Sequence, residues 1–126
     1  MIMRRWRALA ADEAGYLVHF RHRVLPALRR IRGFRGAMVL RSVVNGGIEI
    51  EVLTLWRSME AIYRFAGDNA NHAVVEPEAR AILRRFDRTV RHFEVILDAV
   101  SESAKSPQLR PRSARSRPTR GRAPSS

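Results

Sequence analysis

The sequence predicts one α+β domain over residues 1–98, with strands and helical regions in the order β-α-β-β-α-β. An apolar stripe at helical spacing runs through residues 12–32, two alternating apolar segments flank Asn45-Gly46-Gly47, and a further alternating segment covers residues 90–97. This order is the split β-α-β arrangement of ferredoxin-like domains, with four strands in one antiparallel sheet.

The first strand is expected over residues 1–9, where side chains alternate between two faces. Asp12 is a suitable N-cap for the helix that follows. Pro26 lacks an N–H donor, so we expect a kink or restart near Leu25, and Gly33 ends the helix. The apolar stripe of this helix consists of Leu17, Phe20, Val24, Leu28 and Ile31.

The second half of the domain begins with a hairpin. Asn45-Gly46 tolerates the positive φ angles of a tight turn and joins predicted strands at residues 34–44 and 48–56. Ser58 caps a short helix that ends at Gly67, and Pro77 suits the first turn of another helix. The last strand is expected over residues 90–97. The buried stripe of the helix after Pro77 would consist of Ala79, Ile82, Leu83 and Phe86.

One face of the predicted sheet has no helical cover. The helices pack on one side, and the other side would expose apolar side chains from four strands, which a monomer rarely tolerates. We therefore expect a homodimer packed through its sheets.

The composition excludes several kinds of site. The chain has no cysteine, which excludes disulfides and thiolate metal sites. No segment reaches the roughly 18 apolar residues of a membrane span, and no signal peptide is visible, so the expected location is the cytoplasm. No phosphate loop, Ser/His/Asp set or metal-ligand cluster is visible, so we expect neither a metal nor another cofactor.

Residues 99–126 are rich in Ser, Pro and Arg and are expected to form a disordered basic tail. Residues 101–126 hold seven basic side chains and one acid, so half of the net charge of +12 lies in about a fifth of the chain. These arginines could contact phosphates of a nucleic acid without reading its sequence, or the tail could be a passive extension.

Three segments carry a family resemblance. They are the opening strand Ile2-Met-Arg-Arg-Trp-Arg, the run from Leu53-Thr-Leu-Trp56-Arg-Ser58 to Phe65-Ala-Gly67-Asp68, and the stretch from Val74-Val-Glu-Pro77 to Val90-Arg-His92-Phe-Glu94-Val. Over about residues 1–98 the chain resembles the antibiotic biosynthesis monooxygenase family of dimeric α/β-barrel proteins. The resemblance implies a ferredoxin-like subunit, a dimeric α/β barrel, and a pocket between each sheet and its helices.

The resemblance also implies a chemistry. Characterised enzymes of the family oxidise aromatic polyketide-type substrates with molecular oxygen, without metal or flavin, and other members degrade haem. A cofactor-independent monooxygenase for a small aromatic or quinol-type substrate is therefore expected, with a non-catalytic ligand-binding or dimerisation module as the alternative. Haem degradation is the weaker expectation, because Trp6 and Arg7 lie where those members have an asparagine, and only His72 is near the second helical region.

Under this resemblance, His92 is the candidate catalytic base. Histidine titrates near neutrality, which suits the deprotonation of a phenol or enol. Alternatively, His92 is satisfied by a neighbouring carboxylate or by the backbone. Trp6 and Trp56 would line the substrate pocket, although Trp56 is equally compatible with a core position.

The first strand also offers arginines. Arg4 faces the opposite side of the strand from Arg5 and Arg7. Arg5 is the candidate for binding substrate and stabilising an anionic intermediate, and the alternative is an ion pair with Glu49, Glu51 or Glu94. The remaining histidines, His19, His22 and His72, are expected on the surface or in a loop.

Overall fold

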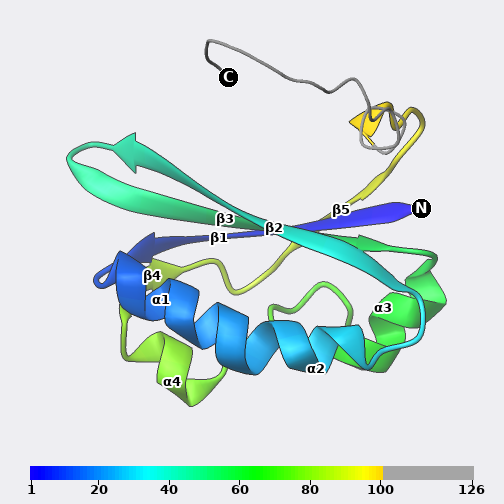
Figure 1. Ribbon diagram of the computed structural model, residues 1–126, viewed down its shortest axis with the longest axis horizontal. Helices are drawn as coiled ribbons and strands as arrows, with labels where there is room; N and C mark the ends of the chain where they lie inside the picture. The colour runs from blue at the N-terminus through cyan, green and yellow to red at the C-terminus, as the bar shows by residue number, and fades with distance from the viewer. Residues whose placement is uncertain (101–126) are drawn as a thin grey trace, which may run out of the picture. The chain divides into compact units, whose positions relative to one another are not determined.

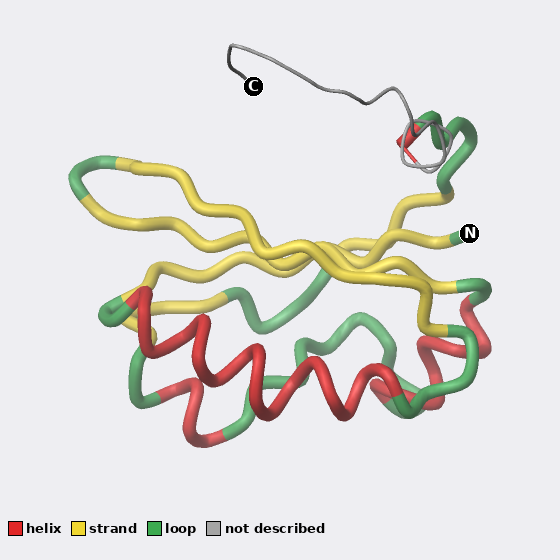
Figure 2. The backbone as a smooth tube through the Cα atoms, viewed as in Figure 1, coloured by secondary structure: helices red, strands yellow, loops and turns green. Residues whose placement is uncertain are grey.

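The computed structural model of the protein describes residues 1–100. Residues 1–95 form a compact unit built around an antiparallel sheet. All helices pack on one face of this sheet (Figures 1 and 2). The elements in chain order are β1 (Ile2–Ala10), α1 (Glu13–His19), the π-helical turn η1 (Phe20–Val24), α2 (Leu25–Arg29), β2 (Phe34–Val44), β3 (Gly47–Trp56), α3 (Met59–Ala66), α4 (Pro77–Arg80), β4 (Leu83–Phe86) and β5 (Arg91–Glu94).

The sheet confirms the predicted α+β class. Its strand order is β2-β3-β1-β4, and β5 also pairs with β1, always antiparallel. The sheet has five strands and not the predicted four, because two short strands share one edge of β1. β5 pairs with residues 2–5 of β1, and β4 pairs with residues 8–10.

The helix over residues 13–29 follows the predicted pattern with one change. Asp12 caps it by accepting a hydrogen bond from the Gly15 N–H at 2.9 Å. One turn before Pro26 the helix widens into η1, where the Leu25 N–H bonds the Phe20 carbonyl five residues back. The restart at Leu25 is confirmed. The turn relieves the crowding that the Pro26 ring would impose on a regular helix.

The predicted helix after Pro77 is wrong beyond its first turn. α4 ends at Arg80, and Leu83–Phe86 forms β4. The apolar stripe is real, since Ala79 and Leu83 are buried, but the stretch after α4 pairs with the edge of β1 that β5 leaves open. Backbone groups on that edge would otherwise lack partners, which explains why pairing prevails over helical periodicity.

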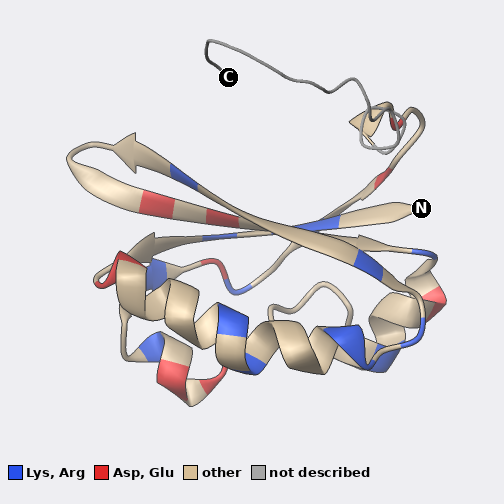
Figure 3. Cartoon of the chain, in the orientation of Figure 1, with Lys and Arg blue, Asp and Glu red and all other residues tan. Residues whose placement is uncertain are grey.

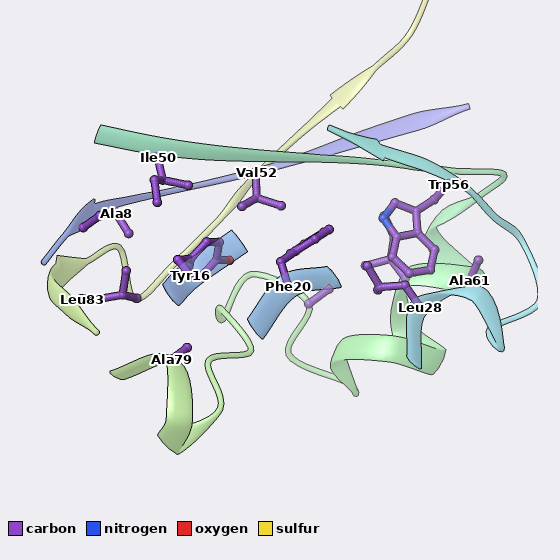
Figure 4. Packing of buried hydrophobic residues seen from close by; sticks show 13 residues of the cluster. Ala8, Tyr16, Phe20, Leu28, Ile50, Val52, Trp56, Ala61, Ala79 and Leu83 are labelled. Carbon is purple, nitrogen blue, oxygen red and sulfur yellow. The ribbon is translucent and has the colours of Figure 1, made fainter. Parts of the chain in front are cut away.

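The core lies between the inner face of the sheet and the helices (Figure 4). Tyr16, Phe20 and Leu28 point from the long helix toward Val52 and Trp56 of β3. Tyr16 takes the buried position expected of Leu17, which is 38% exposed. Among residues 1–100, no helix has the length and apolar character needed to cross a membrane.

The basic tail predicted for residues 99–126 lies outside the described residues from residue 101 onward. The structure therefore leaves the predictions made for it untested.

A pair of glycine variants tests the packing between the start of β2 and α3. Both Gly33 (φ +97°) and Gly46 (φ +79°) adopt positive φ, but a Cβ at Gly33 would lie 2.6 Å from the Ala61 Cβ, whereas nothing lies within 4 Å at Gly46. Gly46→Ala should lower the free energy of unfolding by about 1–2 kcal/mol through backbone strain alone. Gly33→Ala should lower it further, because Ala61 is fully buried. Urea unfolding measures both, and equal losses would contradict this packing.

Candidate functional site

A cavity of about 60 Å³ lies between the inner face of the sheet and the helical layer. Its walls are mainly apolar, and its aromatic side chains are Trp6, Tyr16, Phe20 and Phe65. Its polar side chains are Arg4, Thr54, Glu76 and the Tyr16 phenol. The volume exceeds the 10–15 Å³ or so that one water needs, but it is far below the roughly 300–1,000 Å³ of pockets for drug-sized ligands.

Arg4 is the charged group at the centre of this site. Its position on β1 turns it inward with Trp6 and Ala8, and it is 4% exposed. Its Nη1 donates to the Ala70 carbonyl, and its Nη2 donates to the His72 carbonyl at 2.9 Å. Burial lowers the pKa of Arg4 to about 10, so the guanidinium stays charged at neutral pH.

None of the ion pairs within residues 1–100 includes Arg4. Its partners are carbonyl oxygens, an imidazole nitrogen and the Phe65 ring, whose centroid lies 5.5 Å from its Cζ. The site therefore contains a buried positive charge that forms no ion pair with a carboxylate of residues 1–100.

His92 contacts Arg4 directly. It lies opposite Arg4 in the β1–β5 register, and its Nε2 is 3.0 Å from Arg4 Nη1. A guanidinium can only donate, so Nε2 accepts and the neutral ring carries its proton on Nδ1. Burial, followed by the charge of Arg4, lowers the pKa of His92. His92 is not among the side chains that line the cavity.

A second polar group lies on the helical side of the cavity. His19, expected on the surface, is only 8% exposed, and its Nε2 lies 3.3 Å from Glu76 Oε1. Its surface assignment is wrong because the face of α1 that carries Tyr16 turns toward the sheet. Burial, followed by the charge of Glu76, raises the pKa of Tyr16, whose hydroxyl has no hydrogen-bond partner among the described residues.

The two tryptophans differ in their relation to the cavity. Trp6 lines it, with its ring beside Tyr16 (centroids 6.1 Å apart) and its Nε1 donating to the Asp87 carbonyl at 2.7 Å. Trp56 is fully buried and lies outside the lining. It supports the cavity indirectly, by donating to Thr54 Oγ1 at 2.8 Å and stacking on Phe65.

Arg5 lies on the opposite face of the sheet. Its Nε is 3.4 Å from Glu51 Oε2, which confirms the ion pair considered as the alternative to substrate binding. Arg7, on the same face, pairs with Asp87 at 3.3 Å. In the β2–β3 hairpin the acidic residues lie on β3 and the basic residues lie on β2 (Figure 3).

The cavity beside Arg4 does not fit a metal or a haem. Residues 1–100 contain no group of three or more His, Asp or Glu side chains placed to hold a metal ion. No histidine lines the cavity, so no imidazole faces it as an axial ligand, and about 60 Å³ is too small for a porphyrin.

Sequence reasoning missed Tyr16, Thr54 and Glu76 as site residues, and it chose Arg5 in place of Arg4. For Arg4 a signal was present, since strand alternation alone puts it on the face of Trp6 and opposite Arg5. For Glu76 there was none, because only the fold brings residue 76 beside His19.

The contact between Arg4 and His92 predicts a pH dependence. The pKa of His92 in the folded chain is below its usual 6.5, so the unfolded chain binds a proton more readily. Stability should therefore fall as the pH drops below about 6.5 toward the lowered folded pKa. His92→Gln keeps an acceptor for Arg4 but cannot be protonated, so it should lose less stability over this range. Urea unfolding of both proteins at about pH 7.5 and 5.5 tests this, and parallel losses would contradict it.

The fold has counterparts among solved structures. A Bacillus cereus protein provisionally assigned as an antibiotic biosynthesis monooxygenase aligns with a TM-score of 0.51 and 17% identity, over 77% of this chain and 92% of that one. The heme-degrader MhuD from Mycobacterium tuberculosis, with two hemes bound in its active site, aligns with a TM-score of 0.52 and 24% identity, over 78% of this chain and 98% of that one.

No family model matches the sequence, and no curated protein matches it. At these identities the structural matches establish the architecture alone, and that architecture is the one the sequence resemblance implies. The chain thus has the ferredoxin-like α+β fold found in the antibiotic biosynthesis monooxygenase-type structure and in MhuD.

Proposed function

We propose that the protein is a cofactor-independent monooxygenase for a small aromatic or quinol-type substrate, which reacts in the cavity beside Arg4. For a naphthol, a ring C–H and the O–H become the two carbonyls of a quinone. One oxygen atom of O₂ ends on the ring carbon, the other leaves as water, and the substrate supplies all four electrons. The observation that carries this proposal is the unneutralised guanidinium of Arg4 in an aromatic-walled cavity.

Arg4 supports the electron transfer that begins such a reaction. A phenol must ionise before it gives an electron to oxygen readily, and a fixed positive charge in a poorly solvated site favours the ionised form. Trp6, Phe20 and Phe65 supply flat apolar surfaces against which an aromatic ring can pack.

His92 remains the candidate base, with a constraint from its geometry. Its Nε2 accepts from Arg4, so a proton can be taken there only if that contact opens. The alternative role is to hold Arg4 in position.

We also propose a homodimer packed through the outer face of the sheet, as expected from the sequence. That face carries Met38 and Leu40, 46% and 41% exposed, which pair across β2–β3 with Leu53 and Glu51. An apolar surface of this kind is typical of an interface.

Sedimentation equilibrium tests the assembly. The protein should sediment as a dimer, and Met38→Glu should shift it toward monomer, because a carboxylate would be buried without a partner. Val43→Glu is the matched control. Val43 is 67% exposed and lies near the hairpin tip on the opposite face, so this variant should remain dimeric. A monomeric parent protein would contradict the proposal.

Oxygen consumption with a panel of naphthols and quinols tests the activity. Arg4→Gln should lower the rate about 10²–10³-fold, as loss of a preorganised electrostatic group does. Arg5→Gln makes the same change on the other face and should retain activity. A loss confined to Arg5→Gln would restore Arg5 as the substrate arginine, and a rate no higher than background for every substrate would reject the activity. With ¹⁸O₂, one labelled atom should enter the product.

His92→Gln separates the two roles of His92 in the same assay. If His92 is the base, the variant loses activity, because glutamine cannot take the proton. If His92 only holds Arg4, the variant keeps activity, because the amide oxygen still accepts from Nη1.

A specific observation favours the second candidate function, a non-catalytic ligand-binding module. The cavity holds only about 60 Å³, and the lone pair of His92 Nε2 is already engaged. Binding without oxygen consumption across the panel would identify this function.

A further inference from the structure

We propose that the ligand of this cavity is an aromatic monoanion, with a carboxylate or an ionised phenol or enol whose charged oxygen faces Arg4. This ligand class rests on the proposed function, because both concern the same cavity. It specifies the charge of the substrate, which the proposed function leaves open. Three features of the cavity support it: the hydrogen bonds between its polar groups, the charges that line it and the shape of its walls.

The charge of Arg4 is not balanced by an ion pair within residues 1–100. A buried charge is costly unless an opposite charge or a dense set of dipoles compensates for it. Among residues 1–100, the groups that contact Arg4 are the carbonyls of Ala70 and His72, the imidazole of His92 and the Phe65 ring, and all are neutral. A ligand that brings one negative charge completes the pair.

Several hydrogen-bond donors of the site lack an acceptor among the described residues. Of the five N–H groups of Arg4, the Nε–H and one on Nη2 have no acceptor among residues 1–100. Thr54 lies directly opposite Arg4 in the β1–β3 register, and its Oγ1 already accepts from Trp56, which leaves its hydroxyl proton free. The Tyr16 hydroxyl also lacks a partner within the described chain. An anionic oxygen accepts and never donates, so it matches these groups.

The charges that line the cavity favour a single negative charge on the ligand. Glu76 is the only carboxylate in the described lining of the cavity, and it lies beside His19 and forms no ion pair with Arg4. Its charge would repel a second negative group on the ligand, so a dianion is disfavoured.

The aromatic walls of the cavity suit a planar ligand. Arg4 lies against the Phe65 ring, and Trp6 and Phe20 face the same space. A planar carboxylate can pair with a guanidinium through two parallel hydrogen bonds, and the ring attached to it can pack on these aromatic walls.

Calorimetry with benzoate and benzamide, at about pH 7 and without oxygen, tests the inference. The two probes have nearly the same shape and differ in charge, so benzoate should bind about 10- to 100-fold more tightly, as expected for charge-assisted hydrogen bonds. Arg4→Gln should abolish this preference. Arg7→Gln is the matched control, because it removes one positive charge from the opposite face, and it should keep the preference.

Two further measurements keep the test decisive if Arg4→Gln fails to fold. Arg4→Lys keeps the charge without the planar fork, so it should retain part of the preference for benzoate. In the unmodified protein, bound 4-nitrophenol should ionise at a lower pH than free 4-nitrophenol, which its visible phenolate absorbance reports.

Equal affinity for the two probes, a preference that survives in Arg4→Gln, or no binding of either probe would overturn the inference. Because binding is measured without oxygen, the two proposals fail separately. A benzoate preference without oxygen consumption on any phenol removes the monooxygenase and leaves the anion site. Oxygen consumption by a protein that binds both probes equally removes the anion site and leaves the monooxygenase.

Discussion

The Arg4 guanidinium is the group on whose contacts the rest of the site depends. It joins three parts of the chain that are distant in sequence: β1, where it originates, the loop that contains Ala70 and His72, and β5 through His92. The loop has little regular structure of its own, so these bonds fix its carbonyls against the sheet. The same group is the main source of positive charge inside the cavity. One side chain therefore both holds the loop and sets the charge of the site.

Strand register explains why these groups meet. His92, Arg4 and Thr54 occupy one row across β5, β1 and β3, and all three face the helices. The next row carries Trp6 and Val52, which place an aromatic and an aliphatic side chain beside the charge. A shift of one residue in either pairing would move the arginine to the outer face and bring Arg5 inward. Register in this sheet is thus as important for the site as the identity of its residues.

Much of the fold was predictable because local signals agreed with one another. Asn45-Gly46, the Asp12 and Ser58 caps and the restart before Pro26 each have a nearby physical cause, and the structure contains each of them. The division of the last sheet position between β4 and β5 was not predictable, because it depends on how much of β1 the final strand covers. The spacing of Ala79 and Leu83 correctly predicted that both side chains are buried. It could not show that Leu83 lies in a strand and not in a helix.

The candidate site was less accessible from sequence. Trp6 could be placed, and the inward direction of Arg4 followed from alternation, but Arg5, the residue chosen as the substrate arginine, forms an ion pair with Glu51 on the outer face. The partnership of His19 with Glu76 joins residues 57 positions apart, and nothing local indicates it. Long-range contacts of this kind set the environment of titratable groups. The chemistry of the cavity therefore depends on long-range contacts more strongly than the formation of the fold does.

The two sheet edges differ in how readily they could pair with a strand from another chain. On one side, β4 and β5 are four residues each and a loop separates them, so no long row of free amide and carbonyl groups is available to a stray strand. On the other side, β2 extends over eleven residues and is the open edge. A register irregularity near Gly36 and the charged side chains of Arg35 and Arg41 interrupt it. Such interruptions discourage the pairing of β2 with a strand from another chain.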